Sequence, residues 1–159
     1  MIDFDAKQWL DSLSQAVSLI RTEELLNQAR RERMLSLGGA SSDPHVSSSP
    51  SNDPMRAVDI VVDAESDMRK RLESAIREVE YAKKVFLAMR EKPGSVIADS
   101  SVVLELMYVY GESLADISKT LNISVSTARR RKDLGIDWLN ANGLPNVVNG
   151  RTSNNIAAM

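Results

Sequence analysis

The sequence predicts an all-α protein in which a long helical hairpin of coiled-coil type is followed by a C-terminal helix-turn-helix. Two long segments carry apolar residues at steps of three and four, and shorter segments bounded by capping residues follow them. Hydrophobic residues make up 43% of the 159 residues but aromatic residues only 4%, so the core is expected to be mostly aliphatic. This length suffices for one ordinary domain or two small ones.

The first amphipathic helix is predicted from about Asp5 to Leu37. The step from Ile20 to Leu25 interrupts its apolar spacing, so we expect the buried face to shift there. Two glycines then end the helix. The apolar residues that define it are Ala6, Trp9, Leu10, Leu13, Ala16, Val17, Ile20, Leu25, Leu26 and Ala29.

Residues 38–52 read GGASSDPHVSSSPSN and have almost nothing to bury, which predicts a flexible, disordered linker. His45, the single histidine of the chain, lies in this segment and is expected to face solvent. The next helix then starts with Asp53 as its cap and Pro54 in its first turn.

The second helix, from Pro54 to about Glu91, carries a seam of residues at alternating steps of three and four, and only Glu65 in it is polar. A helix with such a stripe is not stable alone in water, so it needs a partner. The partner is either the first helix, folded back as an antiparallel hairpin, or a second copy of the chain, and we expect self-association through this helix. The seam consists of Val58, Val61, Glu65, Met68, Leu72, Ala75, Val79, Ala82, Phe86 and Met89.

Three shorter helices are predicted after residue 92. The first is expected to be capped by Asp99 or Ser100 and to end before Gly111. Ser113 caps the second, which ends near Leu121, and Ser124 caps the third, which extends to about Asn142 before Gly143 and Pro145. The chain therefore divides into a hairpin region (1–92), a helix-turn-helix domain (97–142) and a disordered tail (143–159).

The segment Asn122-Ile123-Ser124 is the predicted turn of the helix-turn-helix. Asn122 occupies the position where a left-handed residue is usually needed. The small Ala128 allows the two helices to approach closely. The residues expected to pack between the helices are Ile117, Leu121, Ile123 and Ala128, and those on the inner stripe of the last helix are Ala128, Gly135 and Leu139, with Trp138 as a core anchor.

The opposite face of the last helix carries the residues that we expect to contact DNA. The N-terminal residues of a recognition helix meet base edges in the major groove. There an Arg guanidinium can donate two hydrogen bonds to one guanine. The Ser124 hydroxyl and the free N–H groups at the helix start suit phosphate, and Arg131 at the flank suits the backbone. The predicted DNA-binding residues are Ser124, Val125, Ser126, Thr127, Arg129, Arg130 and Arg131.

This stretch resembles region four of bacterial sigma factors in residues Gly111, Ser113, Ile117, Leu121, Ile123, Ser124 and Thr127. Over roughly residues 50–140 the order of parts resembles the small phage-encoded transcriptional regulators of the RinA and ArpU type. The resemblance implies a sequence-specific DNA-binding regulator of phage or prophage origin that acts on promoters of late or packaging genes. Asn122 and Ala128 depart from the Gly and Val common in that pattern.

Composition excludes several other functions. The absence of Cys excludes disulfides, Cys-ligated metals and a thiol nucleophile, and a single His nearly excludes His-based catalysis. No apolar run reaches the roughly 20 residues that a membrane helix needs. We therefore expect a non-enzymatic protein without a cofactor, located in the cytoplasm of a bacterial host cell and not in a membrane.

The net charge of −2 does not by itself favour nucleic acid, and the acidic residues between 111 and 141 nearly cancel the basic ones. One copy is therefore expected to bind double-stranded DNA weakly, which favours a dimer or help from RNA polymerase. Two alternatives remain open. One is a small terminase-like subunit of phage DNA packaging, which assembles into rings, and the other is a helix-turn-helix frame that binds protein only.

Overall fold

The computed structural model describes residues 4–37, 54–92 and 95–150, and every regular element in these residues is a helix, which confirms the predicted all-α class. The predicted linker (38–52) and the cap at Asp53 lie outside the described residues. The helices are α1 (Ala6–Leu37), α2 (Pro54–Arg90), α3 (Val96–Tyr108), α4 (Leu114–Thr120), α5 (Val125–Asn142) and α6 (Leu144–Val148). Among the helices of these ranges, none combines the length and the apolar character that a membrane-spanning helix requires.

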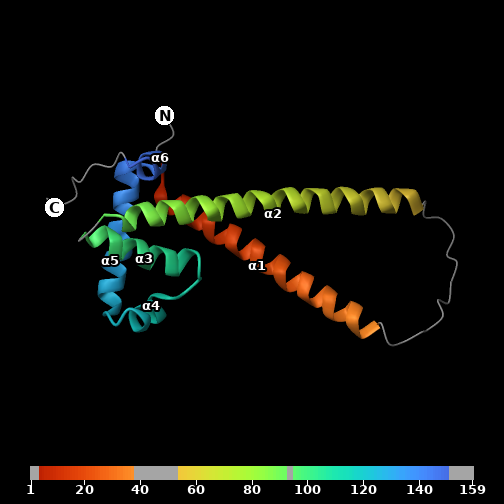
Figure 1. Ribbon diagram of the computed structural model, residues 1–159, viewed down its shortest axis with the longest axis horizontal. Helices are drawn as coiled ribbons and strands as arrows, with labels where there is room; N and C mark the ends of the chain where they lie inside the picture. Colours follow the sequence, from red (N-terminus) through yellow and green to blue (C-terminus); the bar gives the residue numbers. More distant parts are fainter. Residues whose placement is uncertain (1–3, 38–53, 93–94, 151–159) are drawn as a thin grey trace.

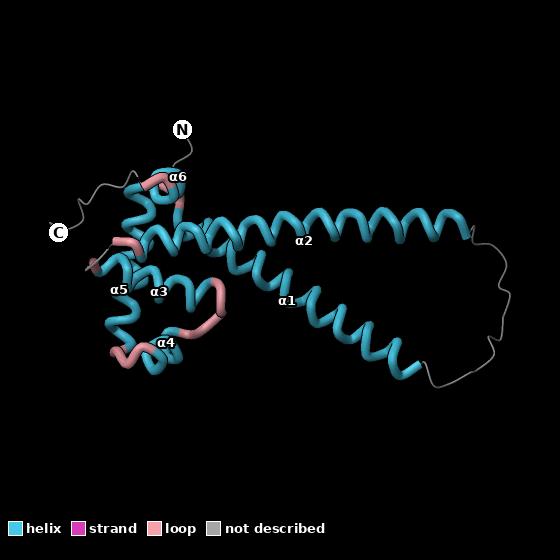
Figure 2. Tube along the Cα trace, in the orientation of Figure 1, coloured by secondary structure: helices cyan, strands magenta, loops and turns pink. Residues whose placement is uncertain are grey.

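The long helices α1 and α2 run antiparallel, pack together where α1 begins and α2 ends, and diverge toward their other ends (Figure 1). The remaining four helices gather at the packed end and are joined by short loops (Figure 2). The rings of Trp9 and Phe86 lie 6.3 Å apart between α1 and α2. Farther along, the Ser12 hydroxyl donates a hydrogen bond of 2.8 Å to Glu78 Oε1.

One apolar core joins the packed end of α1 and α2 to the C-terminal helices. Its larger buried side chains each stabilise the fold by about 1.5–3 kcal/mol relative to an exposed position. This core has members on both sides of the predicted boundary between residues 92 and 97. The members of this cluster are Ala6, Leu10, Leu13, Ala82, Val85, Phe86, Met89, Leu104, Val109, Trp138, Leu139, Leu144 and Val147.

Among the described side chains, the seam of α2 is buried only in the C-terminal part of the helix. Ala82, Phe86 and Met89 are fully buried, whereas Met68 keeps 38% of its surface exposed and Glu65 faces solvent. The side chains of Val58 and Val61 lie outside the described residues. The reason is geometric, because α1 moves away from α2 toward the N-terminal end of α2 (Figure 1).

The start of α3 and the C-terminal tail differ from the predictions. Ser95, rather than Asp99 or Ser100, occupies the N-cap of α3. Ser100 lies buried inside this helix, where its hydroxyl donates to the carbonyl oxygen of Val96 at 2.8 Å, so it does not act as a cap. The tail predicted to be disordered from residue 143 instead begins with helix α6, because Leu144 and Val147 are buried in the core; residues 151–159 lie outside the described part.

Candidate nucleic-acid interface

The turn between α4 and α5 is a Schellman motif centred on Asn122. Leu121 caps α4, and Asn122 follows with φ of 52°, the predicted left-handed conformation. The N–H of Ile123 donates to the carbonyl of Ser118 at 3.0 Å, and the N–H of Asn122 donates to that of Lys119 at 3.2 Å. These are the two bonds that define the motif, and they fix the direction in which the chain enters α5.

Both helices begin at the predicted serine caps. The Ser113 hydroxyl accepts from the N–H of Asp116 at 3.2 Å and donates to the Asp116 carboxylate at 2.6 Å. The Ser124 hydroxyl accepts from the N–H of Thr127 at 3.1 Å. Each cap satisfies one of the backbone donors that an α-helix leaves free at its start.

The inner face of α5 packs against α3 and α4. Ala128, Gly135 and Leu139 are buried as predicted, and Trp138 keeps 3% exposure. A Cβ at Gly135 would lie 2.7 Å from Leu104 Cδ1, which is closer than carbon atoms can approach. The absence of a side chain at Gly135 therefore lets α5 lie directly on α3.

A second, smaller apolar cluster holds α4 between α3 and the start of α5. It includes all four side chains predicted to lie between the two helices, together with apolar residues of α3. Its buried members are Val103, Ile117 and Ala128, with Leu106, Met107, Leu114, Leu121 and Ile123 packed around them.

The outer face at the start of α5 exposes Val125, Ser126, Arg129 and Arg130. Within the described residues neither guanidinium has an ion-pair partner, because the ion pairs there involve other cations. Thr127 is half-buried, and its hydroxyl lies 2.8 Å from that of Ser124. The exposed part of the predicted set therefore forms one surface over the first two turns of α5.

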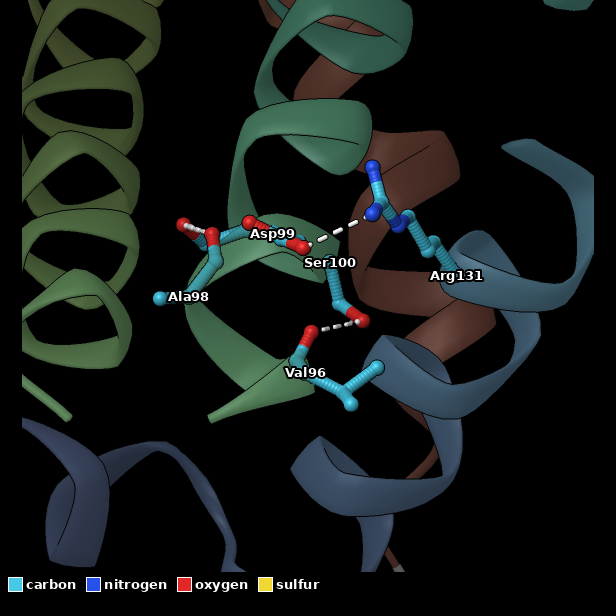
Figure 3. Close-up of polar contacts among 6 residues, drawn as sticks. Val96, Ala98, Asp99, Ser100 and Arg131 are labelled. Atoms are coloured by element: carbon cyan, nitrogen blue, oxygen red, sulfur yellow. Dashed lines mark hydrogen bonds and ion pairs between the residues drawn. The ribbon is translucent and has the colours of Figure 1, made fainter. Parts of the chain in front are cut away.

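Arg131 departs from this surface. Its guanidinium pairs with the Asp99 carboxylate of α3 at 2.8 Å, and the side chain is only 25% exposed. Figure 3 shows Arg131 extending from α5 across to Asp99 on α3. Its predicted phosphate contact is not supported by this geometry, because the group is directed toward α3. The neighbouring Lys132 forms an ion pair with Asp133, with Nζ 3.2 Å from Oδ1.

Two polar contacts from α1 attach this unit to the long helices, and sequence analysis indicated neither. Arg21 donates to the carbonyl oxygens of Val109 and Tyr110, both at 3.0 Å, at the end of α3. The N–H of Ala6 donates to Asn140 Oδ1 at 2.7 Å. Cations are favourable at the C-terminal end of a helix, but the partner segments are too far apart in sequence for a local pattern to connect them.

Tyr108 lies half-buried at the contact of α1, α3 and α5. Burial raises the pKa of its phenol, and the carboxylates of Asp11 and Asp133 raise the pKa further. The phenol therefore stays neutral at physiological pH and adds no charge beside α5.

In the described part of the chain no group of three or more His, Cys, Asp or Glu side chains is placed to hold a metal ion. What the site offers chemically is a pair of exposed guanidinium groups and free backbone donors at a helix start. Comparison with protein-family models, curated proteins and solved structures gives no match to this chain.

Proposed function

We propose that the chain is a transcriptional regulator that binds double-stranded DNA through the first two turns of α5. In this proposal α4 and α5 act as a helix-turn-helix, and the α1–α2 hairpin is its support. The observation that carries the proposal is the pair Arg129 and Arg130, which is exposed on α5 and has no ion-pair partner among the described residues. The opposite face of the helix is buried at Ala128, Gly135 and Leu139.

Each group at the start of α5 has a distinct role in this proposal. Arg129 and Arg130 reach guanine edges or phosphates in the major groove, where a bidentate contact discriminates by about 1–3 kcal/mol. The N–H groups of Val125 and Ser126 have no acceptor inside the helix and suit a phosphate oxygen. Ser124 supports this start indirectly, because its hydroxyl already accepts the N–H of Thr127.

The biological setting follows from the sequence resemblance alone. A regulator similar to the phage-encoded RinA and ArpU type would act on promoters of late or packaging genes in the host cytoplasm. A single chain offers few cations to DNA, so RNA polymerase bound nearby is a suitable helper.

The test is DNA binding by the double variant Arg129→Ala, Arg130→Ala. A fluorescein-labelled random-sequence duplex at low salt serves as the probe, and binding is followed by fluorescence anisotropy over a salt series. We expect the double variant to lose most of its affinity, and the slope of log K against log salt to become shallower by about one for each arginine that contacts phosphate.

The matched control is Lys83→Ala, Lys84→Ala, which removes the same charge from exposed positions on α2. This control should bind the duplex almost as tightly as the wild type, with only the small loss that the change in net charge causes. Equal losses in both variants would contradict the proposed surface. Wild-type protein with no affinity even at low salt would favour a frame that binds protein only, and a mass corresponding to a large ring would favour a terminase-like subunit.

A further inference from the structure

The outer halves of α1 and α2 have no partner in the described structure. The two helices separate beyond the packed end (Figure 1). Several large apolar side chains on these halves are exposed to solvent. Leu25 is 67% exposed and Leu35 is 82% exposed on α1, and Val62 is 56% exposed on α2. Isolated helices of this kind are marginal in water, so their apolar faces require cover.

The apolar face of α1 changes sides after Ile20. With about 3.6 residues per turn, Leu25, Leu26 and Ala29 lie on roughly the opposite side of α1 from the inner residues that pack on α2, whereas Met34 and Leu35 return to the inner side. The inner set is Leu10, Leu13 and Ala16, and the outer set is Leu25, Leu26 and Ala29. Closing the hairpin within one chain would therefore leave the outer set facing away from α2.

A groove of about 290 Å³ opens where the two helices separate. Its floor includes the buried Ala16 and Ala75 together with Leu19, and Arg71 and Glu78 lie at its edge. Small side chains on the floor let another helix approach closely. This groove lies between the segments of α1 and α2 that precede the outer halves.

Charges along the two outer halves follow opposite orders. Going outward from the core, α1 presents the acidic residues 23–24 and then a basic stretch, residues 30–33, with three Arg and one Glu. Going outward along α2, the basic residues 69–71 come first and the acidic Asp63, Glu65 and Asp67 follow. An antiparallel pairing of α1 with α2 matches both stretches, so the chain carries the two halves of one complementary pair.

One antiparallel register also brings a charged residue of each stripe together. Arg33 is the charged residue on the outer stripe of α1, after Leu26 and Ala29, and Glu65 is the charged residue in the seam of α2, before Met68. Both are exposed. In an antiparallel pair that places Leu26 beside Leu72, Arg33 and Glu65 come together, because each lies seven residues farther out along its helix. A charged pair within an apolar seam fixes its register.

From the uncovered faces, the change of side on α1 and the charge order, we infer that a second copy of this chain covers them. The outer half of α1 in each chain lies antiparallel along the outer half of α2 in the other, and Arg33 of one chain pairs with Glu65 of the other. The antiparallel direction places both packed ends at the same end of the dimer. This pairing does not depend on DNA binding.

The test uses two single substitutions, Arg33→Glu and Glu65→Arg, and sedimentation equilibrium over a concentration series. Wild-type protein should be a dimer. Each variant alone should associate at least about tenfold more weakly, because both symmetry-related pairs then bring like charges together. A one-to-one mixture should restore the dimer, because each variant supplies the charge that the other lacks.

The matched control is Arg31→Glu, which makes the same charge change on the side of α1 away from the stripe and should leave the dimer intact. Circular dichroism should show the same helix content for the wild type, the Arg31→Glu control and the one-to-one mixture. A wild-type monomer at every concentration overturns the inference. A one-to-one mixture that stays monomeric also overturns the inference. If the charged pair formed within one chain, mixing the two variants would not restore it.

Discussion

Replacing Asn122 with Ala and with Gly tests how the turn orients α5. Asn122 has φ of 52°, and its side chain is exposed, so substitution changes the backbone preference without removing core contacts. The left-handed conformation costs most residues with a Cβ roughly 1–2 kcal/mol. The cost is smaller for Asn because of its short polar side chain, and Gly has no such cost. We expect Asn122→Ala to lower the free energy of unfolding by about 1 kcal/mol and Asn122→Gly to stay within about 0.5 kcal/mol of wild type.

Urea and thermal unfolding followed by circular dichroism measure this difference. For a protein of this length, 1 kcal/mol corresponds to a shift in Tm of about 2–4 °C. The Gly variant should also retain the affinity of the wild type for the labelled duplex, because the Schellman bonds to Ser118 and Lys119 use backbone atoms. An Ala variant as stable as the Gly variant would refute the reasoning, since no packing effect at this exposed position could mask the backbone cost.

Two further substitutions test the placement of α5. Gly135→Ala should lower stability by about 1–2 kcal/mol, because overpacking against Leu104 exceeds the gain of about 1 kcal/mol in helix propensity. In a Leu104→Ala background, measured by a double-mutant cycle in urea, the same change should cost little, and strict additivity would contradict the close approach of α5 to α3. Arg131→Ala should lower the free energy of unfolding by about 0.2–1 kcal/mol through loss of the pair with Asp99. It should reduce DNA affinity less than Arg129→Ala does in the anisotropy assay. The reverse order of affinities would place Arg131 in the binding surface again.

The elements that could be predicted from sequence are those that neighbouring residues determine. The caps Ser113 and Ser124 and the left-handed Asn122 bond to backbone groups within a few positions along the chain. The same holds for the apolar spacing that places α1 and α2. The exposure of Arg129 and Arg130 followed as well, because Ala128 and Leu139 define the opposite side of the same helix.

The remaining features depend on contacts between distant segments. Arg131 is predicted to contact the DNA backbone because it lies at the flank of the proposed surface, and only the packing of α3 on α5 brings Asp99 within its reach. Ser100 resembled a cap in sequence, yet in the packed helix its hydroxyl bonds a carbonyl of the preceding turn. The short α6 carries too few apolar residues for a periodic signal, and its order comes from the burial of Leu144 and Val147 in the core.

The ion pair of Arg131 bears on how the proposed surface would bind DNA. With that cation directed to Asp99, one chain presents Arg129 and Arg130 as its exposed arginines on α5, and electrostatic affinity rises with each phosphate neutralised. A second chain doubles the number of cations. The inferred pairing would place the two packed ends together, so both α5 helices would lie at one end of the dimer. Two-fold related half-sites are the DNA arrangement that such a dimer fits, and a dimer-disrupting Arg33→Glu should then weaken DNA binding although residue 33 lies far from α5.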